Sequence, residues 1–397
     1  MIKRSDLYCL SLLFLAGMSV DSLWKRDATG FIIAESETYL NTRPQSKVDA
    51  CMTDPDSPEV SRFQRILDQI VSRVTACITL LLWIGVSICY AWQPDVCAAV
   101  TVYPSWCWFV GGLCLALILL RAKRQRMALV SIGLWFVFLV VFADTPLSLW
   151  RGVWHQTEAV AQVKQPGQIP LRVISLNAHG SSRAVAALKR YEPDLILIQE
   201  SPGAGTLIEV GKTMLGENSG LLAGVDASIL SRAPLEPVAS TVNYTIGKVR
   251  VQSGQEIIVV SLRLTPPPFR ADLWNPECWR AYSKQRIHQR DELQQLTRRL
   301  SELPADLPLI VGGDFNVNPR DPIFNELPPE LRDAFSTAGV GWGNTITNEA
   351  PFLRIDQVWV NHFLESVQVF SEVASDTDHR LVLADLLLKP APAHSAK

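Results

Sequence analysis

The sequence lacks several features that would place it in well-known classes. It has no C-x-x-C pair, and only Cys278 of its eight cysteines lies beyond residue 150. This excludes a disulfide framework from the C-terminal part and argues against a structural zinc site there. A net charge of −2 excludes a global basic field that would attract nucleic acid. The chain also has no internal repeat and no low-complexity tract.

Charged residues are missing from three long apolar segments, at 74–92, 105–120 and 127–143. Each is close to the roughly 17–25 residues that a helix needs to cross the hydrocarbon layer. Five cysteines lie between residues 77 and 114, where they are expected to be small apolar residues of such helices. The alternative is a buried helical hairpin in a soluble protein, but three such segments in a row favour three transmembrane helices within residues 71–145.

The placement of lysine and arginine predicts the orientation of these helices. Three arginines precede the first segment, the loop at 93–104 has no Lys or Arg, and the next loop reads "RAKRQR". Because basic loops stay in the cytoplasm, residues after about 145 are expected outside it. The chain is therefore predicted to be a multi-pass protein of the cell inner membrane. Apolar spans without charges argue against a transport protein.

The first 70 residues are ambiguous. The stretch "LYCLSLLFLAGMSV" is typical of a short signal-peptide core, and it also fits a non-spanning apolar segment or an upstream start that is not used. The predicted organisation is an unassigned segment at 1–70, the helices at 71–145, a linker at 146–169, a folded domain at 170–389 and a tail at 390–397.

From about residue 170 the pattern becomes α/β. Buried strands are expected at 171–176, in "LILIQE", "ASILSRAPL", "EIIVVSLRL", "LPLIVGGDFN", "RIDQVWV" and "RLVLADLLL". Helices are expected in "RAVAALKRYEPD" and in the charged stretch "CWRAYSKQRIHQRDELQQLTRRLSEL", which should lie on the surface. Strand signals outnumber helix signals, and polar residues gather where strands end.

These strand ends carry a set of hard oxygen and nitrogen donors. The set comprises Asn177, Glu200, Asp314, Asn316, Asp356, Asp378 and His379. Strand ends on one edge of a sheet bring distant residues together. Such donors suit a divalent cation together with a phosphate. Gly312 and Gly313, directly before Asp314, are expected to let the backbone turn sharply or come close to a ligand.

The ordered run "LNAHG … ILIQE … GGDFNVNP … RIDQVWV … DTDHRLV" resembles the endonuclease/exonuclease/phosphatase superfamily, which has the deoxyribonuclease-I-like fold. The resemblance spans residues 170–388, and the layout is similar to that of bacterial membrane-anchored members. It implies a four-layer α/β sandwich after the three transmembrane helices. It also implies hydrolysis of phosphoesters with Mg²⁺, or Mn²⁺ in its place, as in a nuclease, phosphodiesterase or phosphatase.

The resemblance also implies roles for individual residues around the metal. Glu200 would be the main metal ligand, and Asn177 would help at the metal or hold the phosphate. Asp378 would lie at or near the metal site. Asp314 would orient or deprotonate the attacking water.

A second group would act on the phosphate. Asn316 would donate a hydrogen bond to a phosphoryl oxygen, and His379 would stabilise the charge that develops there. Asp356 would bond to His379, fix its tautomer and raise its pKa, which favours imidazolium near neutral pH.

One position departs from the family pattern. In "VVSLRLTPPP" an arginine, Arg263, stands where many relatives carry a histidine. Arginine is a permanent cation with a planar donor fork that suits phosphate, but it cannot act as a general acid at neutral pH. Arg263 is therefore predicted to bind phosphate; the alternative is an arginine that reaches solvent or forms a structural ion pair.

The substrate class stays open at this point. Residues 171–397 hold 22 Lys and Arg against 26 Asp and Glu, which does not favour duplex DNA. A basic patch on one helix, formed by Arg280, Lys284, Arg286 and Arg290, could still exist. Nucleic acid, a phospholipid headgroup and a small phosphodiester remain candidates, and no protein partner is indicated. A different function is a catalytically weak domain that binds phosphate ligands as a sensor or scaffold on a membrane anchor.

Overall fold

The structure, a computed structural model, describes residues 58–143, 145–154, 167–251 and 254–390. The predictions for residues 1–57, for 155–166 of the linker and for the tail from 391 lie outside this range. The chain divides into two compact units. One holds the residues up to Ser87 together with Cys107–Leu139, and the other holds Ile88–Trp106 and Val140–Lys397.

The apolar segments form three helices. They are α2 (Pro58–Trp92), α4 (Ser105–Arg121) and α5 (Gln125–Phe142). Ile66–Trp92 of α2 and all of α5 are long and apolar enough to cross a membrane. Helix α4 passes only together with the short segment Asp95–Thr101, from which it bends by 65°. Among the described residues, two helices, or up to three, could therefore span a membrane.

The second unit is built on two six-stranded sheets. The first has the order β11 (Leu364–Glu372), β12 (Leu381–Leu388), β1 (Ile169–Asn177), β2 (Leu195–Gln199), β4 (Ala227–Ser231) and β3 (Gly220–Leu222). The second has the order β5 (Leu235–Ser240), β6 (Tyr244–Arg250), β7 (Glu256–Arg263), β8 (Leu309–Asp314), β10 (Asp356–Val360) and β9 (Arg332–Asp333). Strands β1 and β2 are parallel, as are β7 and β8.

The central strands are buried on both faces, which explains their continuous apolar sequences. In β2, Leu195 and Leu197 belong to the core between the two sheets. Ile196 and Ile198 face the opposite way, into a second core beneath helices. Successive side chains of a strand point to opposite faces of the sheet, and in β2 both faces are apolar.

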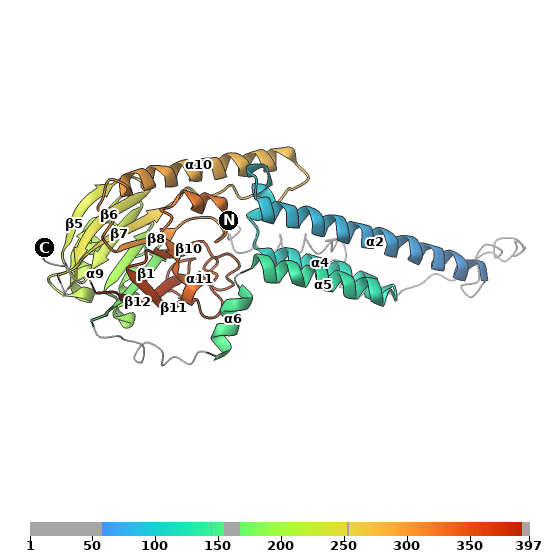
Figure 1. The fold of residues 1–397 in the computed structure, drawn as a ribbon, viewed down its shortest axis with the longest axis horizontal. Helices are drawn as coiled ribbons and strands as arrows, with labels where there is room; N and C mark the ends of the chain where they lie inside the picture. The colour runs from blue at the N-terminus through green and yellow to red at the C-terminus, as the bar shows by residue number, and fades with distance from the viewer. Residues whose placement is uncertain (1–57, 144, 155–166, 252–253, 391–397) are drawn as a thin grey trace, which may run out of the picture. The chain divides into compact units, whose positions relative to one another are not determined.

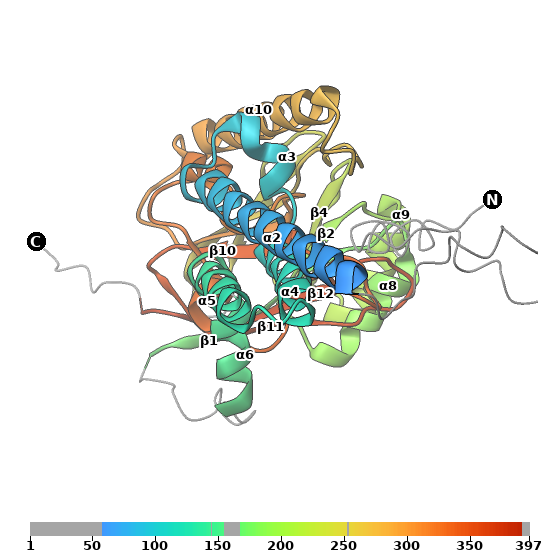
Figure 2. The same cartoon turned by 90° about the vertical axis from the view of Figure 1, so that its right-hand side faces the viewer.

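Helices cover the outer face of each sheet. The first sheet is covered by α8 (Ser182–Ala186), the 3₁₀ turn η3 (Ala187–Tyr191) and α9 (Ala204–Leu215). The second is covered by α10 (Pro276–Leu300) and η4 (Pro322–Glu326). Figures 1 and 2 show α10 and α9 on opposite sides of the paired sheets. The predicted four-layer α/β sandwich is confirmed.

The charged stretch that was predicted to be a surface helix forms α10, but part of this helix is buried. Asn275 caps its N-terminus by accepting a hydrogen bond from the Glu277 N–H, and Pro276 takes the first position. Leu293, Leu296 and Leu300 lie at helical spacing and pack on the second sheet. Arg286, Gln289 and Glu292 of the same helix are also buried.

Two details of this unit add to the expectations from the sequence. Helix α6 (Thr145–Trp154) occupies the beginning of the segment predicted to be a linker. The pair Gly312 and Gly313 makes room for protein, not for a ligand: a side chain at the first would meet Leu197, and one at the second would meet the Leu262 backbone. The glycines let β8 pack tightly against its neighbours.

Candidate active site

The sheet topology gathers the predicted residues at one edge of the sandwich. Asn177 ends β1 and is in register with Gln199, the residue before Glu200. Asp314 ends β8 and pairs across the sheet with Asp356 at the start of β10. Because β1 and β2 are parallel, and β10 runs antiparallel to β8, these ends meet at the same edge.

Asn177 connects the two sheets by a pair of hydrogen bonds. Its Nδ2 donates to Glu200 Oε1 at 3.1 Å and to Asp314 Oδ2 at 3.0 Å. Its Oδ1 accepts from the backbone N–H of His179 at 3.1 Å, which fixes the orientation of the amide. Asn177 is fully buried, so it acts as an internal bridge between two carboxylates.

Glu200 is ionised and accessible. Burial opposes ionisation, but the hydrogen bond from Asn177 and the charge of Arg263 lower the pKa of Glu200 below its ordinary value. Its side chain is 29% exposed, in contrast to that of Asp314, at 2%. Glu200 is thus the carboxylate of this pair that solvent and ligands can reach.

Asp314 has the opposite electrostatic environment. Burial and the neighbouring Asp356 charge raise the pKa of Asp314 to about 7, against the attraction of His379. Its Oδ1 accepts from the backbone N–H of Asn316 at 3.0 Å. A carboxyl group with such a pKa suits proton transfer near neutral pH.

His379 and Asp356 form a buried pair. His379 Nδ1 lies 2.8 Å from Asp356 Oδ2, and both residues are almost fully buried. Burial alone would lower the pKa of His379, but the charges of Asp356, Asp314 and Asp378 outweigh it and raise that pKa to about 10. The ring therefore holds both protons at neutral pH, and Nε2 is the nitrogen left to contact an anion.

Arg263 lies among carboxylates. Its Nη2 is 2.8 Å from Glu200 Oε1, and its Nη1 is 2.8 Å from Asp226 Oδ2. Its Nε lies 3.9 Å from Asp314 Oδ2 and is buried without a hydrogen-bond partner among the described residues. The guanidinium is therefore held inside the site, where it offsets several negative charges.

Asn316, Asp378 and His179 complete the edge. Asn316 Nδ2 donates to the Leu264 carbonyl at 2.9 Å. His179 Nδ1 lies 3.2 Å from Glu200 Oε2 and 3.9 Å from Asp378 Oδ1, at the exposed rim. His179, Glu200 and Asn316 all have φ near +50°, a strained region for residues other than glycine. Such strain is frequent at functional sites.

Sequence reasoning missed three residues of this edge. Asp226 precedes β4 and bonds Arg263, and His179 stands inside the quoted "LNAHG". Thr377 Oγ1 donates to the Asn177 carbonyl at 2.7 Å and accepts from the His379 N–H at 3.2 Å. Asp226 could have been found from its position directly before a strand, because the other site residues also lie at or next to strand ends.

The donors fit a hard divalent cation. Glu200 and Asp378 both approach one atom, His179 Nδ1, so two carboxylates gather at the accessible rim. The buried Asn177 amide lies behind them, bonded to Glu200. Asp314, Asp356 and His379 form a second, buried group whose side-chain O and N atoms lie within 4.8 Å of one another, but a doubly protonated His379 has no lone pair for a metal, so the accessible rim fits a cation better. Asp356 Oδ1 is buried without a partner among the described residues. Oxygen donors with few carboxylates suit Mg²⁺ or Mn²⁺.

The predicted basic patch on α10 is wrong for two of its members. Arg286 is buried and pairs with Asp321 at 2.9 Å, and Arg290 pairs with Asp95 at 2.6 Å. Arg280 is exposed, but it forms an ion pair with Glu277 on the same helix. All three arginines form ion pairs with carboxylates of the protein.

Comparisons with known proteins identify a family. The sequence model described as the Endonuclease/Exonuclease/phosphatase family matches residues 174–379, more than half of the chain. No curated protein sequence matches the chain.

Solved structures are similar to the chain at low identity. An endonuclease/exonuclease/phosphatase from Beutenbergia cavernae DSM 12333 is 19% identical over 56% of this chain and 73% of its own, with a TM-score of 0.42. One from Bacteroides vulgatus is 16% identical over 56% of this chain and 100% of its own, with a TM-score of 0.44. The mannosyl-6-phosphatase Bt3783 of Bacteroides thetaiotaomicron VPI-5482 is 15% identical over 54% of this chain and 99% of its own, with a TM-score of 0.41.

Proposed function

Because the chain belongs to the endonuclease/exonuclease/phosphatase family, we propose that it is a Mg²⁺-dependent phosphoester hydrolase anchored in a membrane. The observation that carries the proposal is the Asn177 bridge, which joins Glu200 of one sheet to Asp314 of the other beside the His379–Asp356 pair. Phosphoryl transfer depends mainly on positioning and charge stabilisation, and these groups offer both.

In the proposed reaction each group has one task. Glu200, with Asn177 and Asp378, would hold the cation, which supplies charge stabilisation and orients the phosphoryl group. Asp314 would orient the attacking water and accept its proton. The imidazolium of His379, held by Asp356, would bind the phosphoryl oxygen on which charge grows. Asn316 would reach the same phosphoryl group after its amide leaves the Leu264 carbonyl.

The membrane part of the proposal rests on helix length and charge. Helices α2 and α5, and α4 with its bent partner segment, could span the bilayer. The basic "RAKRQR" loop would remain in the cytoplasm, so the catalytic unit would face the opposite side of the cell inner membrane.

A second candidate function is a phosphate-binding domain with weak catalysis, and the position of Arg263 favours it. An arginine that pairs with Glu200 places a fixed positive charge beside the proposed cation ligand. Such a charge weakens cation binding by repulsion.

Metal removal tests the proposed function. The full chain, purified in detergent, is expected to hydrolyse bis-p-nitrophenyl phosphate, to lose that activity with EDTA and to regain it with excess Mg²⁺. The physical reason is that the cation would offset the negative charges of the rim carboxylates and of the phosphate, so its removal should weaken both substrate binding and charge stabilisation. Release of p-nitrophenol measures the rate. Binding of phosphate without metal-dependent turnover of this ester would favour the second candidate.

The substitution Arg263→Met separates the two roles of the arginine. If Arg263 binds the substrate phosphate, KM should rise about 10–100-fold, since a hydrogen bond to a charged group contributes about 1.5–3 kcal/mol. If it only holds Glu200 and Asp226, KM should stay constant while the Mg²⁺ concentration for half-maximal rate falls, because a repelling cation is removed. Steady-state kinetics at varied ester and varied Mg²⁺ measure both, and an unchanged KM refutes the phosphate role.

A further inference from the structure

We call residues 315–321, between β8 and η4, the active-site loop. This loop is bonded to the segment that joins two of the apolar helices. We call residues 93–104, between α2 and α4, the connector; it contains η2 (Asp95–Cys97) and α3 (Ala98–Thr101). Asn318, two residues after Asn316, donates from Nδ2 to the carbonyls of Thr101 at 2.7 Å and Val102 at 2.6 Å. The connector and the catalytic residues belong to one compact unit.

Buried charges hold the connector in place. Arg286 of α10, only 4% exposed, donates to the carbonyls of Gln93 and Pro94 at 3.3 Å each and to the Thr101 hydroxyl. It also pairs with Asp321 of the active-site loop. A buried guanidinium with these partners is costly to separate from them, so the attachment is a fixed feature of the fold.

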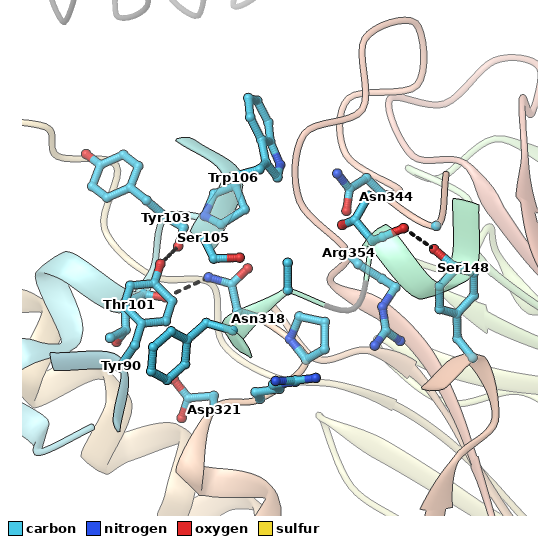
Figure 3. Close-up of a pocket in the computed structure, with 18 of the residues that line it drawn as sticks. Tyr90, Thr101, Tyr103, Ser105, Trp106, Ser148, Asn318, Asp321, Asn344 and Arg354 are labelled. Atoms are coloured by element: carbon cyan, nitrogen blue, oxygen red, sulfur yellow. Dashed lines mark hydrogen bonds between the residues drawn. The ribbon is translucent and has the colours of Figure 1, made fainter. Parts of the chain in front are cut away.

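The end of the third apolar helix meets the same loop. Arg320 donates to the carbonyl of Val141, next to the last residue of α5, at 2.7 Å. Between these elements lies a cavity of about 70 Å³ (Figure 3). Tyr90, Tyr103 and Trp106 line it from the connector side, and Asn318 and Asn344 line it from the catalytic side. The buried Nδ2 of Asn344 has no partner among the described residues and is available to an acceptor.

A loop with exposed aromatic residues lies beside the connector. In residues 264–275, Phe269 is 62% exposed and Trp274 is 77% exposed. Tyr103 of the connector donates to the Arg270 carbonyl in this loop at 3.2 Å. A smaller cavity is lined by Ala98 and Val102 together with Asn316. Exposed aromatic side chains next to the ends of apolar helices are typical of the membrane–water interface.

From these contacts we infer that the rim of the active site lies against the bilayer surface and that the substrate is a phosphodiester of a membrane lipid. The inference rests on the proposed function. If α2, α4 and α5 span the bilayer, then Trp92, Ser105 and Phe142 lie at its surface, and the active-site loop is bonded to the residues beside them. The acidic balance of the domain also disfavours nucleic acid as the substrate. In the reaction water adds to phosphorus, one P–O ester bond breaks, and the leaving alcohol oxygen takes up a proton.

The test compares two diesters with the same leaving group. The full chain is reconstituted into phosphatidylcholine vesicles that contain dioleoylglycero-phospho-p-nitrophenol, and a parallel reaction contains soluble bis-p-nitrophenyl phosphate. We expect the vesicle probe to be hydrolysed at least about tenfold faster at equal bulk concentration, because anchoring raises its effective concentration at the rim. The double variant Phe269→Ala/Trp274→Ala should lower the ratio of vesicle to soluble turnover at least about tenfold, since it removes the apolar area that enters the interface.

The control is Val242→Ala in the turn between β5 and β6, which removes an exposed apolar side chain (60% exposed) far along the chain from the connector and should leave the ratio unchanged. Hydrolysis of the soluble ester without the vesicle probe would overturn the lipid inference and keep the proposed function. Faster cleavage of a DNA oligonucleotide than of the vesicle probe would also overturn it. Hydrolysis of neither diester would refute the proposed function itself.

Discussion

Replacing Glu200 by glutamine is expected to weaken cation binding by about 100-fold or more and to lower turnover at fixed Mg²⁺ by about 1,000-fold. The substitution keeps the size of the side chain and its place beside Asn177 but removes its charge. Asn177 and Arg263 hold the pKa of Glu200 below its ordinary value, so the residue is ionised at neutral pH and the full charge is lost. Mn²⁺ binding, followed by electron paramagnetic resonance of the free ion, measures the first effect directly.

The matched control is Glu217→Gln, the same chemical change at a side chain that is 83% exposed and paired with Lys212 at 3.5 Å. It should leave Mn²⁺ affinity and turnover unchanged, because an exposed surface pair contributes little. Saturating Mg²⁺ should recover part of the lost rate in Glu200→Gln. Equal Mn²⁺ affinity in Glu200→Gln and the native protein would show that the cation, if any, is held elsewhere.

The sequence patterns predicted the parts of this site that follow from strand ends. Asn177 and Asp314 could be found because each is the polar last residue of a buried and largely apolar strand. The pairing of Asp314 with Asp356 then follows from one register in the second sheet. The family-specific order of the motifs supplied the roles.

Other parts could not be predicted because they depend on single long-range contacts. Asp226 and Arg263 are 37 positions apart and belong to different sheets, so no local pattern links them. The connector has no strong periodicity, and it is held by polar side chains such as Asn318 and Arg286, which are more than 180 positions away. Arg286 is a second example. Its charge and its place on a helix predicted an exposed side chain, but it is buried because its partners, such as Asp321, come from distant segments.

These long-range contacts determine where the candidate active site lies relative to the ends of the apolar helices. If this sheet edge holds the proposed cation site, its position would decide which phosphoesters can reach it. In this chain Asn318 and Arg320 bond that edge to the ends of apolar helices. Specificity for a lipid would then come from where the site is held, with the same catalytic residues that other members would use on soluble esters.

The second large effect is expected at His379. The substitution His379→Gln should lower kcat by about 100–10,000-fold with little change in KM, because it removes a cation that stabilises charge formed only in the transition state. The pKa of His379 is raised to about 10, so in the native protein the imidazolium persists from pH 6 to 8. Steady-state kinetics on the soluble ester measure the loss.

The variant Asp356→Asn distinguishes charge from shape at this pair. It keeps a side chain of the same size beside Nδ1 but removes the carboxylate that raises the pKa of His379. With a lower pKa, His379 in the variant should lose its proton as pH rises through the ordinary range near 6.5. The activity of the variant relative to the native protein should therefore fall between pH 6 and 8. A ratio that does not change with pH would mean that His379 acts without its charge. Thermal unfolding is the control: an unchanged midpoint in both variants would show that the losses are chemical, because a collapsed site would unfold at a lower temperature.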